Sequence, residues 1–262
     1  MSEPAFSRYI GIDYSGAETP LRSVKGLRVY AAGPSGVPVE VAPPPGPKKY
    51  WTRRGIAHWL AETLAQGPPA LVGIDHGFGF PMAYFQKYGL GPDWTAFLRD
   101  FTDHWPTHAD STYVQSVRTG FTGNGPARTG EATWRRLADK RARAKSVFHF
   151  DVPGSVAKST HAGLPWLLHL RERLGEALHF WPFDGWAPPA GRSVIAEAYP
   201  SLVRRQFPVP ARLTQDQLDA YVIAAWMQKA DRSGELGAYF QPDLSQNERR
   251  TASVEGWILG LR

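Results

Sequence analysis

Short apolar runs that stop at glycine or proline recur along this chain and predict buried β-strands. They are RYIGIDY at residues 8–14, LRVYAAG at 27–33, GVPVEVA at 36–42, ALVGID at 70–75 and SVIAEAYP at 193–200. Their short length and the turn residues that bound them favour strands over helices. The first three follow one another closely, as in a hairpin or a meander, so we expect them to pair.

Between and after these runs, apolar residues recur at the spacing of an α-helix. The clearest case has Thr214 as its N-cap, with Gln217 three residues later completing a capping box. Another helix is expected to end at Gly67, because glycine commonly terminates helices. The predicted helices cover residues 52–67, 131–148, 163–175 and 213–230.

The arrangement of these elements predicts one α/β core with an insertion. Three strands, a helix and a fourth strand follow one another through residues 1–79. A further strand and the last long helix lie in residues 191–262. Between them, residues 80–190 change to a mostly helical pattern with a glycine- and threonine-rich loop at 116–130. We therefore expect residues 80–190 to form an inserted helical lid over the core.

Composition places the chain among globular proteins. It has 262 residues, of which 42% are apolar and 21% charged, and it contains no cysteine. Disulfides and thiolate metal sites are thereby excluded, which is consistent with a reducing compartment. No stretch approaches the roughly 18 apolar residues that cross a membrane, and the N-terminus has no long apolar run. We expect a soluble, cytoplasmic protein without a membrane partner.

A net charge of +6 and a pI near 9.6 are compatible with a nucleic-acid or nucleotide partner. Basic residues are concentrated between positions 135 and 145, where a phosphate backbone would find positive charge. The alternative is an ordinary solvated helix face. GSVAKST at 154–160 lacks the glycines of a phosphate-binding loop, but its lysine remains a candidate phosphate contact. The candidate substrate-binding residues are Arg135, Arg136, Lys140, Arg141 and Lys158.

Three of the apolar runs reach a single acidic residue just before the chain turns: Asp13, Asp75 and Glu197. If their strands are parallel neighbours, these carboxylates meet at one edge of the sheet, where α/β proteins commonly place their sites. Asp216 and Asp219 lie three apart on the predicted last helix and share one of its faces. Carboxylates without cysteine suit Mg²⁺ or Mn²⁺, and two such ions commonly promote phosphodiester cleavage.

Each acid also has a purely structural interpretation. Asp13 and Asp75 are able to cap turns, and Asp216 suits the positive end of a helix dipole. Glu197 has Arg192, Arg204 and Arg205 nearby in sequence as ion-pair partners. The repetition of strand, acid and break three times favours a common site over three independent caps.

The motifs GIDYSGA, GIDHGFGFP, KSVFHFDVPGSVAKSTHAGLPWLLHLRE, AEAYPS, DQLDAYVIAAW and EGWIL resemble those of an uncharacterised bacterial family of predicted ribonuclease H-like nucleases. The resemblance runs nearly from end to end. It implies a ribonuclease H-like mixed sheet of three antiparallel strands followed by parallel strands, flanked by helices, with a large mostly helical insertion.

The resemblance also implies roles for single residues. Asp13 is similar to the first-strand acid that bridges metals in ribonuclease H-like nucleases, and Asp75 to the acid on the fourth strand. Glu197 matches the acid before Tyr-Pro, and Asp219 resembles the last-helix carboxylate of Holliday-junction resolvases, with Asp216 as its neighbour. Glu255, in EGWIL, is expected to support the site, with a core salt bridge as the alternative.

Three functions follow as hypotheses. The first is a divalent-metal-dependent nuclease or phosphodiesterase in which Asp13, Asp75, Glu197 and Asp219 are catalytic and, with Asp216, hold Mg²⁺ or Mn²⁺. The second is a nucleotide-binding protein of the actin or sugar-kinase type, with GIDYSGA and DHGFGF as phosphate loops. The third is a non-catalytic binding module that keeps the fold and pairs its acids with arginines. DNA, RNA and small nucleotides remain open as substrates, as do endo- or exonuclease action and oligomeric state.

Overall fold

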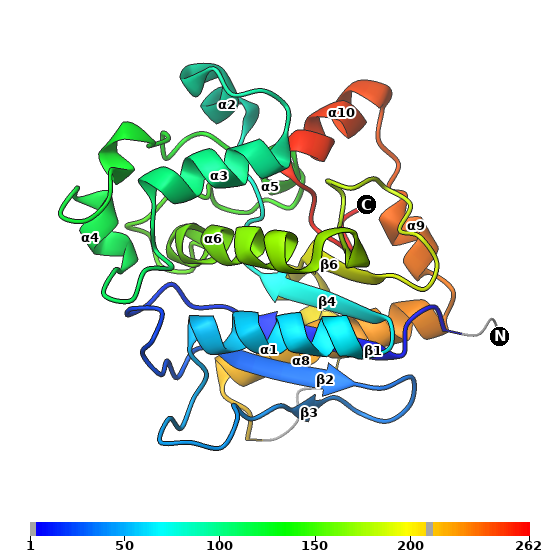
Figure 1. Cartoon of the computed structure of the whole chain (residues 1–262). Helices are drawn as coiled ribbons and strands as arrows, with labels where there is room; N and C mark the ends of the chain where they lie inside the picture. The colour runs from blue at the N-terminus through cyan, green and yellow to red at the C-terminus, as the bar shows by residue number, and fades with distance from the viewer. Residues whose placement is uncertain (1–3, 208–211) are drawn as a thin grey trace.

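The computed structural model of the protein describes residues 4–207 and 212–262. Six strands form one mixed sheet in the order β3-β2-β1-β4-β6-β5 (Figure 1). Strands β3, β2 and β1 pair antiparallel, whereas β1, β4, β6 and β5 run parallel. The strands are β1 (Arg8–Asp13), β2 (Arg28–Ala32), β3 (Val39–Glu40), β4 (Ala70–Asp75), β5 (Leu178–Phe180) and β6 (Ser193–Glu197).

Helices cover both faces of this sheet, which confirms the expected α/β class. In Figure 1, α1 and α6 lie in front of the sheet and α8 lies behind it. Helix α3 packs against α6 and adds a further layer on the front side. The helices are α1 (Arg53–Gln66), α2 (Met82–Tyr88), α3 (Trp94–His104), α4 (Val114–Arg118), α5 (Leu137–Arg141), α6 (Ala157–Leu174), α7 (Pro200–Val203), α8 (Gln215–Arg232), α9 (Leu236–Phe240) and α10 (Gln246–Glu255).

Alternate side chains of the central strands enter different cores. Ile12 and Ile74 pack into the core on the side of α1 and α6, whereas Tyr9 and Leu71 pack into the core on the side of α8. This separation follows from the two-residue period of a strand, which sends successive side chains to opposite faces. The strands are buried on both faces, as parallel strands between helices are expected to be.

Two long helices begin and end where the sequence predicts. Helix α1 is capped by the side chain of Thr52 and stops at Gly67. Helix α8 has the capping box of Thr214 and Gln217, with each side chain bonded to the other residue's backbone N–H. These caps satisfy backbone donors that the first helical turn would otherwise leave without partners.

The predicted basic helix over residues 131–148 is wrong, because only α5 (Leu137–Arg141) is α-helical there. The carboxylate of Asp139 accepts a hydrogen bond from the backbone N–H of Arg136, which fixes the helix start. Arg143 then adopts a left-handed conformation (φ 54°), which ends the helix soon after it begins. The strand predicted over residues 36–42 is likewise reduced to β3.

Residues 80–190 contribute to the sheet as well as to its surroundings. They contain α2 to α6, as the expected helical insertion does, but β5 (Leu178–Phe180) is a strand of the sheet and pairs with β6. Helix α6 also packs directly against α1 on the sheet's front side. The end of this segment therefore belongs to the structural core. Within the described residues, no helix is long and apolar enough to span a membrane.

Candidate functional site

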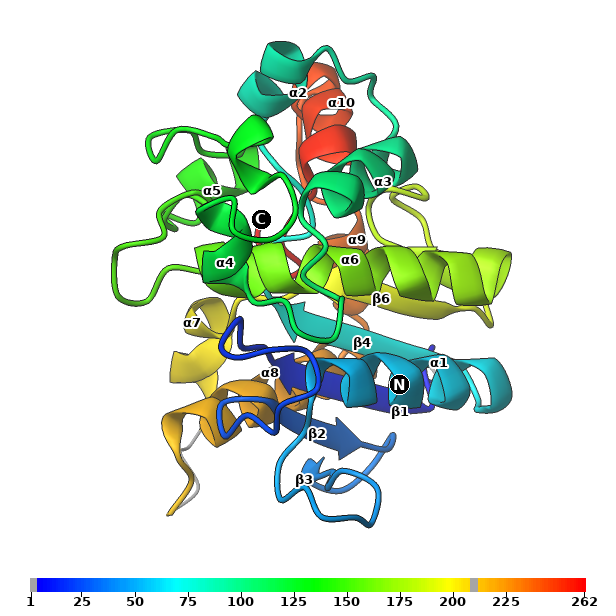
Figure 2. The same ribbon diagram turned by 60° about the vertical axis from the view of Figure 1, so that its left-hand side comes forward.

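Asp13 and Asp75 are neighbours at the carboxyl ends of two parallel strands. They are register partners, as are Gly11 and Gly73 two residues earlier on the same strands. Since residues two apart in a strand share a face, both carboxylates leave the sheet on the side of α8. The arrowheads of β1 and β4 point to the side where α7 and the beginning of α8 lie (Figure 2). The sequence prediction that these two acids converge is thus met by the backbone.

Helix α8 adds two more carboxylates. Asp219 is buried and precedes Ala220, whose carbonyl oxygen faces Gly11 of β1. Asp216 lies one turn earlier, and its carboxylate is near Gly26, which precedes β2. Four acidic side chains from two strands and one helix therefore surround the same end of the sheet.

The charges in this group are strongly coupled. Burial raises the pKa of Asp13 to about 9, and the negative charges of Asp75, Asp219 and Asp216 add to the effect. Burial also raises the pKa of Asp75 to about 8, with Asp219 and Glu197 as further causes. Near neutral pH, both carboxyls consequently favour the protonated form unless a cation stabilises the charge.

Glu197 occupies the other face of the sheet. It is in register with Ile74, one residue short of Asp75, and Ile74 points into the core beneath α1 and α6. A shift of one residue along a strand reverses the face from which a side chain leaves. The structure therefore separates Glu197 from the Asp13–Asp75 pair that sequence reasoning grouped with it.

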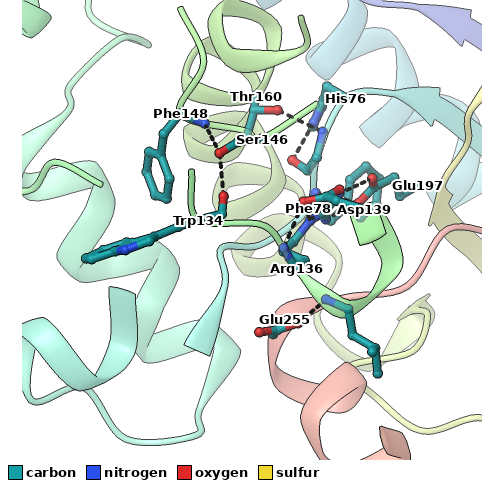
Figure 3. A network of polar contacts seen from close by, with 12 residues as sticks. His76, Phe78, Trp134, Arg136, Asp139, Ser146, Phe148, Thr160, Glu197 and Glu255 are labelled. Atoms are coloured by element: carbon teal, nitrogen blue, oxygen red, sulfur yellow. Dashed lines mark hydrogen bonds and ion pairs between the residues drawn. The ribbon is translucent and has the colours of Figure 1, made fainter. Parts of the chain in front are cut away.

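The carboxylate of Glu197 is instead bound by Arg136 (Figure 3). Two nitrogens of the guanidinium donate to its two oxygens, each at 2.6 Å, and the backbone N–H of Phe78 donates at 2.9 Å. Arg136 also donates to Asp139 at 2.8 Å. All three charged side chains are buried, so they satisfy one another inside the protein.

The predicted substrate-binding cations separate into different environments. Arg136 is 1% exposed and its guanidinium binds Glu197 and Asp139, so a surface role as a phosphate contact does not fit its position. Arg141 is exposed and forms an ion pair with Glu248 at 2.9 Å. Arg135 and Lys140 are exposed.

Glu255 links α10 to two other helices. Its carboxylate accepts the backbone N–H groups of Met82 at 2.7 Å and Leu137 at 2.6 Å, the first residues of α2 and α5. Figure 3 shows Glu255 below Arg136, close to the buried ion network. A carboxylate is favoured at helix starts, where backbone donors point outward. Glu255 therefore orders the surroundings of the buried ion network by helix capping.

A cleft of about 390 Å³ opens directly after Asp13. Its walls come from the loop after β1, the start of α4 and the start of α6. On the loop side, the buried guanidinium of Arg53 binds the carbonyl oxygens of Ala17 and Glu18 and so holds the loop's shape. The lining residues are Tyr14–Glu18, Tyr113–Gln115, Ser155, Lys158 and Ser159.

Lys158 is the basic side chain of this cleft. It is exposed on the first turn of α6, and Gly16 lies against its backbone. A Cβ atom on Gly16 would overlap the carbonyl group of Lys158, so glycine permits this close approach. The sequence singled out Lys158 and, in the nucleotide-binding hypothesis, the loop in GIDYSGA, but it did not indicate that α4 completes the cleft.

Within residues 4–207 and 212–262, no group of three or more histidine, aspartate or glutamate side chains is arranged to hold a metal ion. The third carboxylate nearest the pair, Asp219, is bonded to Arg204 and to Gln215. In the described part of the chain, the other three acids of this group, Asp13, Asp75 and Asp216, have no such side-chain bond. No family model, curated protein or solved structure matches this chain.

Proposed function

We propose that the protein is a divalent-metal-dependent phosphodiesterase, most simply a nuclease, built on a ribonuclease H-like fold. The observation that carries the proposal is the side-by-side placement of Asp13 and Asp75 at the ends of parallel strands, next to the acidic start of α8. The strand order, with three antiparallel strands followed by parallel ones, supports the fold assignment.

The charge of the site supports a cation there. The pKa values of Asp13 and Asp75 are raised to about 9 and 8 even though the positive charge of Arg204 opposes the rise. Oxygen donors of this kind fit Mg²⁺ or Mn²⁺ and would be Asp13 and Asp75, with Asp219 and Asp216 as further donors from α8. An ion held there supplies Lewis-acid chemistry for phosphodiester hydrolysis.

The cleft beyond Asp13 suits a phosphate-bearing substrate. Lys158 offers a positive charge to a phosphate, and hydroxyl groups of Ser15 and Ser155 lie in the same walls. Tyr113, in the cleft wall, and Phe121, just after α4, are exposed aromatic side chains. Such rings stack on unpaired bases without regard to sequence. A single-stranded nucleic acid or a nucleotide is therefore the substrate class that we infer.

Glu197 has a different role in this proposal from the one its sequence suggests. Its carboxylate is saturated by Arg136 and the backbone of Phe78, so it shapes the loop that follows Asp75 instead of binding the ion. That loop leads from β4 to the start of α2. We therefore assign the metal to Asp13, Asp75 and α8, and the supporting structure to Glu197.

A non-catalytic binding module is the second candidate. It is favoured by the ion pairs of Glu197 with Arg136 and of Asp219 with Arg204, which neutralise two of the expected catalytic acids. In such a module the cleft would still bind a phosphate-bearing ligand, but without cleavage.

Cleavage of short DNA and RNA strands in Mn²⁺ and in EDTA separates the two candidates. We expect Mn²⁺-dependent cleavage by the unaltered protein and loss of at least 100-fold in rate, by order of magnitude, in Asp13→Asn and Asp75→Asn. Asp103→Asn, at an exposed position on α3, is the matched control and should keep full activity. Cleavage that persists in Asp13→Asn would contradict the assignment. Binding without cleavage would favour the module, and a thermal shift with ATP and Mg²⁺ alone would favour a nucleotide-binding protein.

A further inference from the structure

Arg204 is the basic residue that the fold places at the carboxylate group. It lies in the short 3-10 turn Arg204–Gln206, directly after α7. Its guanidinium donates to one oxygen of Asp219, and the side-chain amide of Gln215 donates to the other at 3.0 Å. Both oxygens of Asp219 are thereby bonded to the protein itself.

The same guanidinium also acts on the other two acids. Its positive charge lowers the pKa values of both Asp13 and Asp75, against the larger effect of burial and of their negative neighbours. Within the described residues its Nε atom is buried without a hydrogen-bond partner, so the pair with Asp219 is held through one side of the guanidinium. A bidentate pair would be stronger and harder to open.

We propose that Arg204 occupies the position of the cation at this site, and that its release from Asp219 lets the third carboxylate join Asp13 and Asp75 around a divalent ion. The inference rests on the metal site proposed above. The guanidinium already neutralises the charge of Asp219, and a metal ion at the same carboxylate would be repelled by it, so the two cations compete. The metal's apparent affinity is then reduced by the fraction of molecules in which Arg204 holds Asp219.

Competition differs from a general charge effect, and the chain provides the control. Arg205 is the next residue, carries the same charge and is exposed, with no ion pair within the described residues. A general reduction of positive charge should raise the affinity for Mn²⁺ equally in Arg204→Gln and Arg205→Gln. Competition at Asp219 should raise it in Arg204→Gln alone.

The test is titration calorimetry of the full chain with MnCl₂, using the unaltered protein, Arg204→Gln and Arg205→Gln. We expect binding to tighten about two- to fivefold in Arg204→Gln, which is the range for releasing a partly exposed ion pair, and to stay unchanged in Arg205→Gln. Binding in Arg204→Gln when the unaltered protein binds no Mn²⁺ would be the strongest form of the same result. Circular dichroism and thermal melting establish that both variants fold.

Two outcomes would overturn the inference, and they differ in what they leave standing. Unchanged or weaker Mn²⁺ binding in Arg204→Gln, or equal tightening in Arg204→Gln and Arg205→Gln, removes the competition but keeps the metal site and the proposed function. Absence of Mn²⁺ binding in all three proteins removes the metal site, and the inference with it. Because the readout is metal binding, neither conclusion depends on finding the right substrate.

Discussion

Gly73 of β4 lies directly opposite Gly11 of β1, and helix α8 crosses the sheet over this pair. A Cβ atom at Gly11 would overlap the carbonyl oxygen of Ala220, and one at Gly73 would come within 2.6 Å of the Ile223 side chain. Two glycines in register thus let the helix approach the backbone of the sheet. That close approach places Asp219 beside the strand ends.

A methyl group added at Gly11 should therefore destabilise the protein. We expect Gly11→Ala to reduce the free energy of unfolding by about 2–3 kcal/mol, because the overlap is with backbone, which has little freedom to move aside. Urea denaturation followed by circular dichroism measures the change.

Gly91→Ala is the control for the intrinsic effect of replacing glycine. A Cβ atom at Gly91 has no atom within 4 Å among the described residues, so this variant should differ little from the unaltered protein. If Gly11→Ala were as stable as Gly91→Ala, α8 would not lie as close to β1 as the structure has it.

The raised pKa of Asp13 predicts a pH-dependent stability in the absence of metal. An unfolded aspartate has a pKa near 4, whereas that of Asp13 is about 9 in the folded protein. Between these values the folded state keeps a proton that the unfolded state releases, so stability falls as pH rises from about 4 to about 9. Asp13→Asn removes this contribution and should melt progressively higher than the unaltered protein as pH increases.

Melting curves from pH 5 to pH 9 in EDTA measure this difference, and Mn²⁺ provides its control. The ion should stabilise the unaltered protein most at the alkaline end, where the carboxyls ionise readily, and should stabilise Asp13→Asn less. A constant difference in melting temperature across the pH range would mean that Asp13 titrates as an ordinary aspartate.

The sequence predicts the central strands and the helices α1 and α8 well, because local patterns determine them. Apolar runs bounded by glycine mark the strands, and the cap of Thr214 marks the start of α8. The placement of Asp13 and Asp75 at the ends of their strands follows from the same local rule. These features require no knowledge of how distant segments pack.

Features that depend on register or on distant partners could not be predicted in this way. Whether Glu197 aligns with Ile74 or with Asp75 is a difference of one residue, yet it decides which face of the sheet receives the carboxylate. The burial of Arg136 depends on Glu197, 61 positions later in the chain. A cluster of basic residues in the sequence does not reveal which side chain is buried, so Arg136 was predicted to lie on the surface.

The buried pair of Arg136 and Glu197 should contribute strongly to stability. We expect Glu197→Gln to reduce the free energy of unfolding by about 3–5 kcal/mol, because it leaves a buried guanidinium with one carboxylate in place of two. Chemical denaturation at neutral pH measures the loss. Glu248→Gln, which opens the exposed pair with Arg141, is the control and should change stability little.

Binding of Mn²⁺ at the proposed metal site distinguishes the two possible roles of Glu197. If this residue supports the fold without binding the ion, folded Glu197→Gln should retain most of the affinity for Mn²⁺ under conditions where it is stable. Loss of Mn²⁺ binding by Glu197→Gln in a protein with an unchanged circular dichroism spectrum would return Glu197 to the ligand set.

The cleft beyond Asp13 predicts a specific effect of Lys158 on nucleic-acid binding. Lys158→Ala should weaken the binding of a short single-stranded oligonucleotide about three- to tenfold, because one positive charge is removed from the cleft. The slope of the logarithm of the binding constant against the logarithm of the salt concentration should fall in magnitude by about one, which corresponds to one lost phosphate contact. Fluorescence anisotropy at several salt concentrations gives both quantities. Lys48→Ala, in an exposed loop before α1, removes the same charge away from the cleft and should leave the salt dependence unchanged. Equal effects of the two variants would mean that the protein attracts nucleic acid through its net charge, with no contact at Lys158.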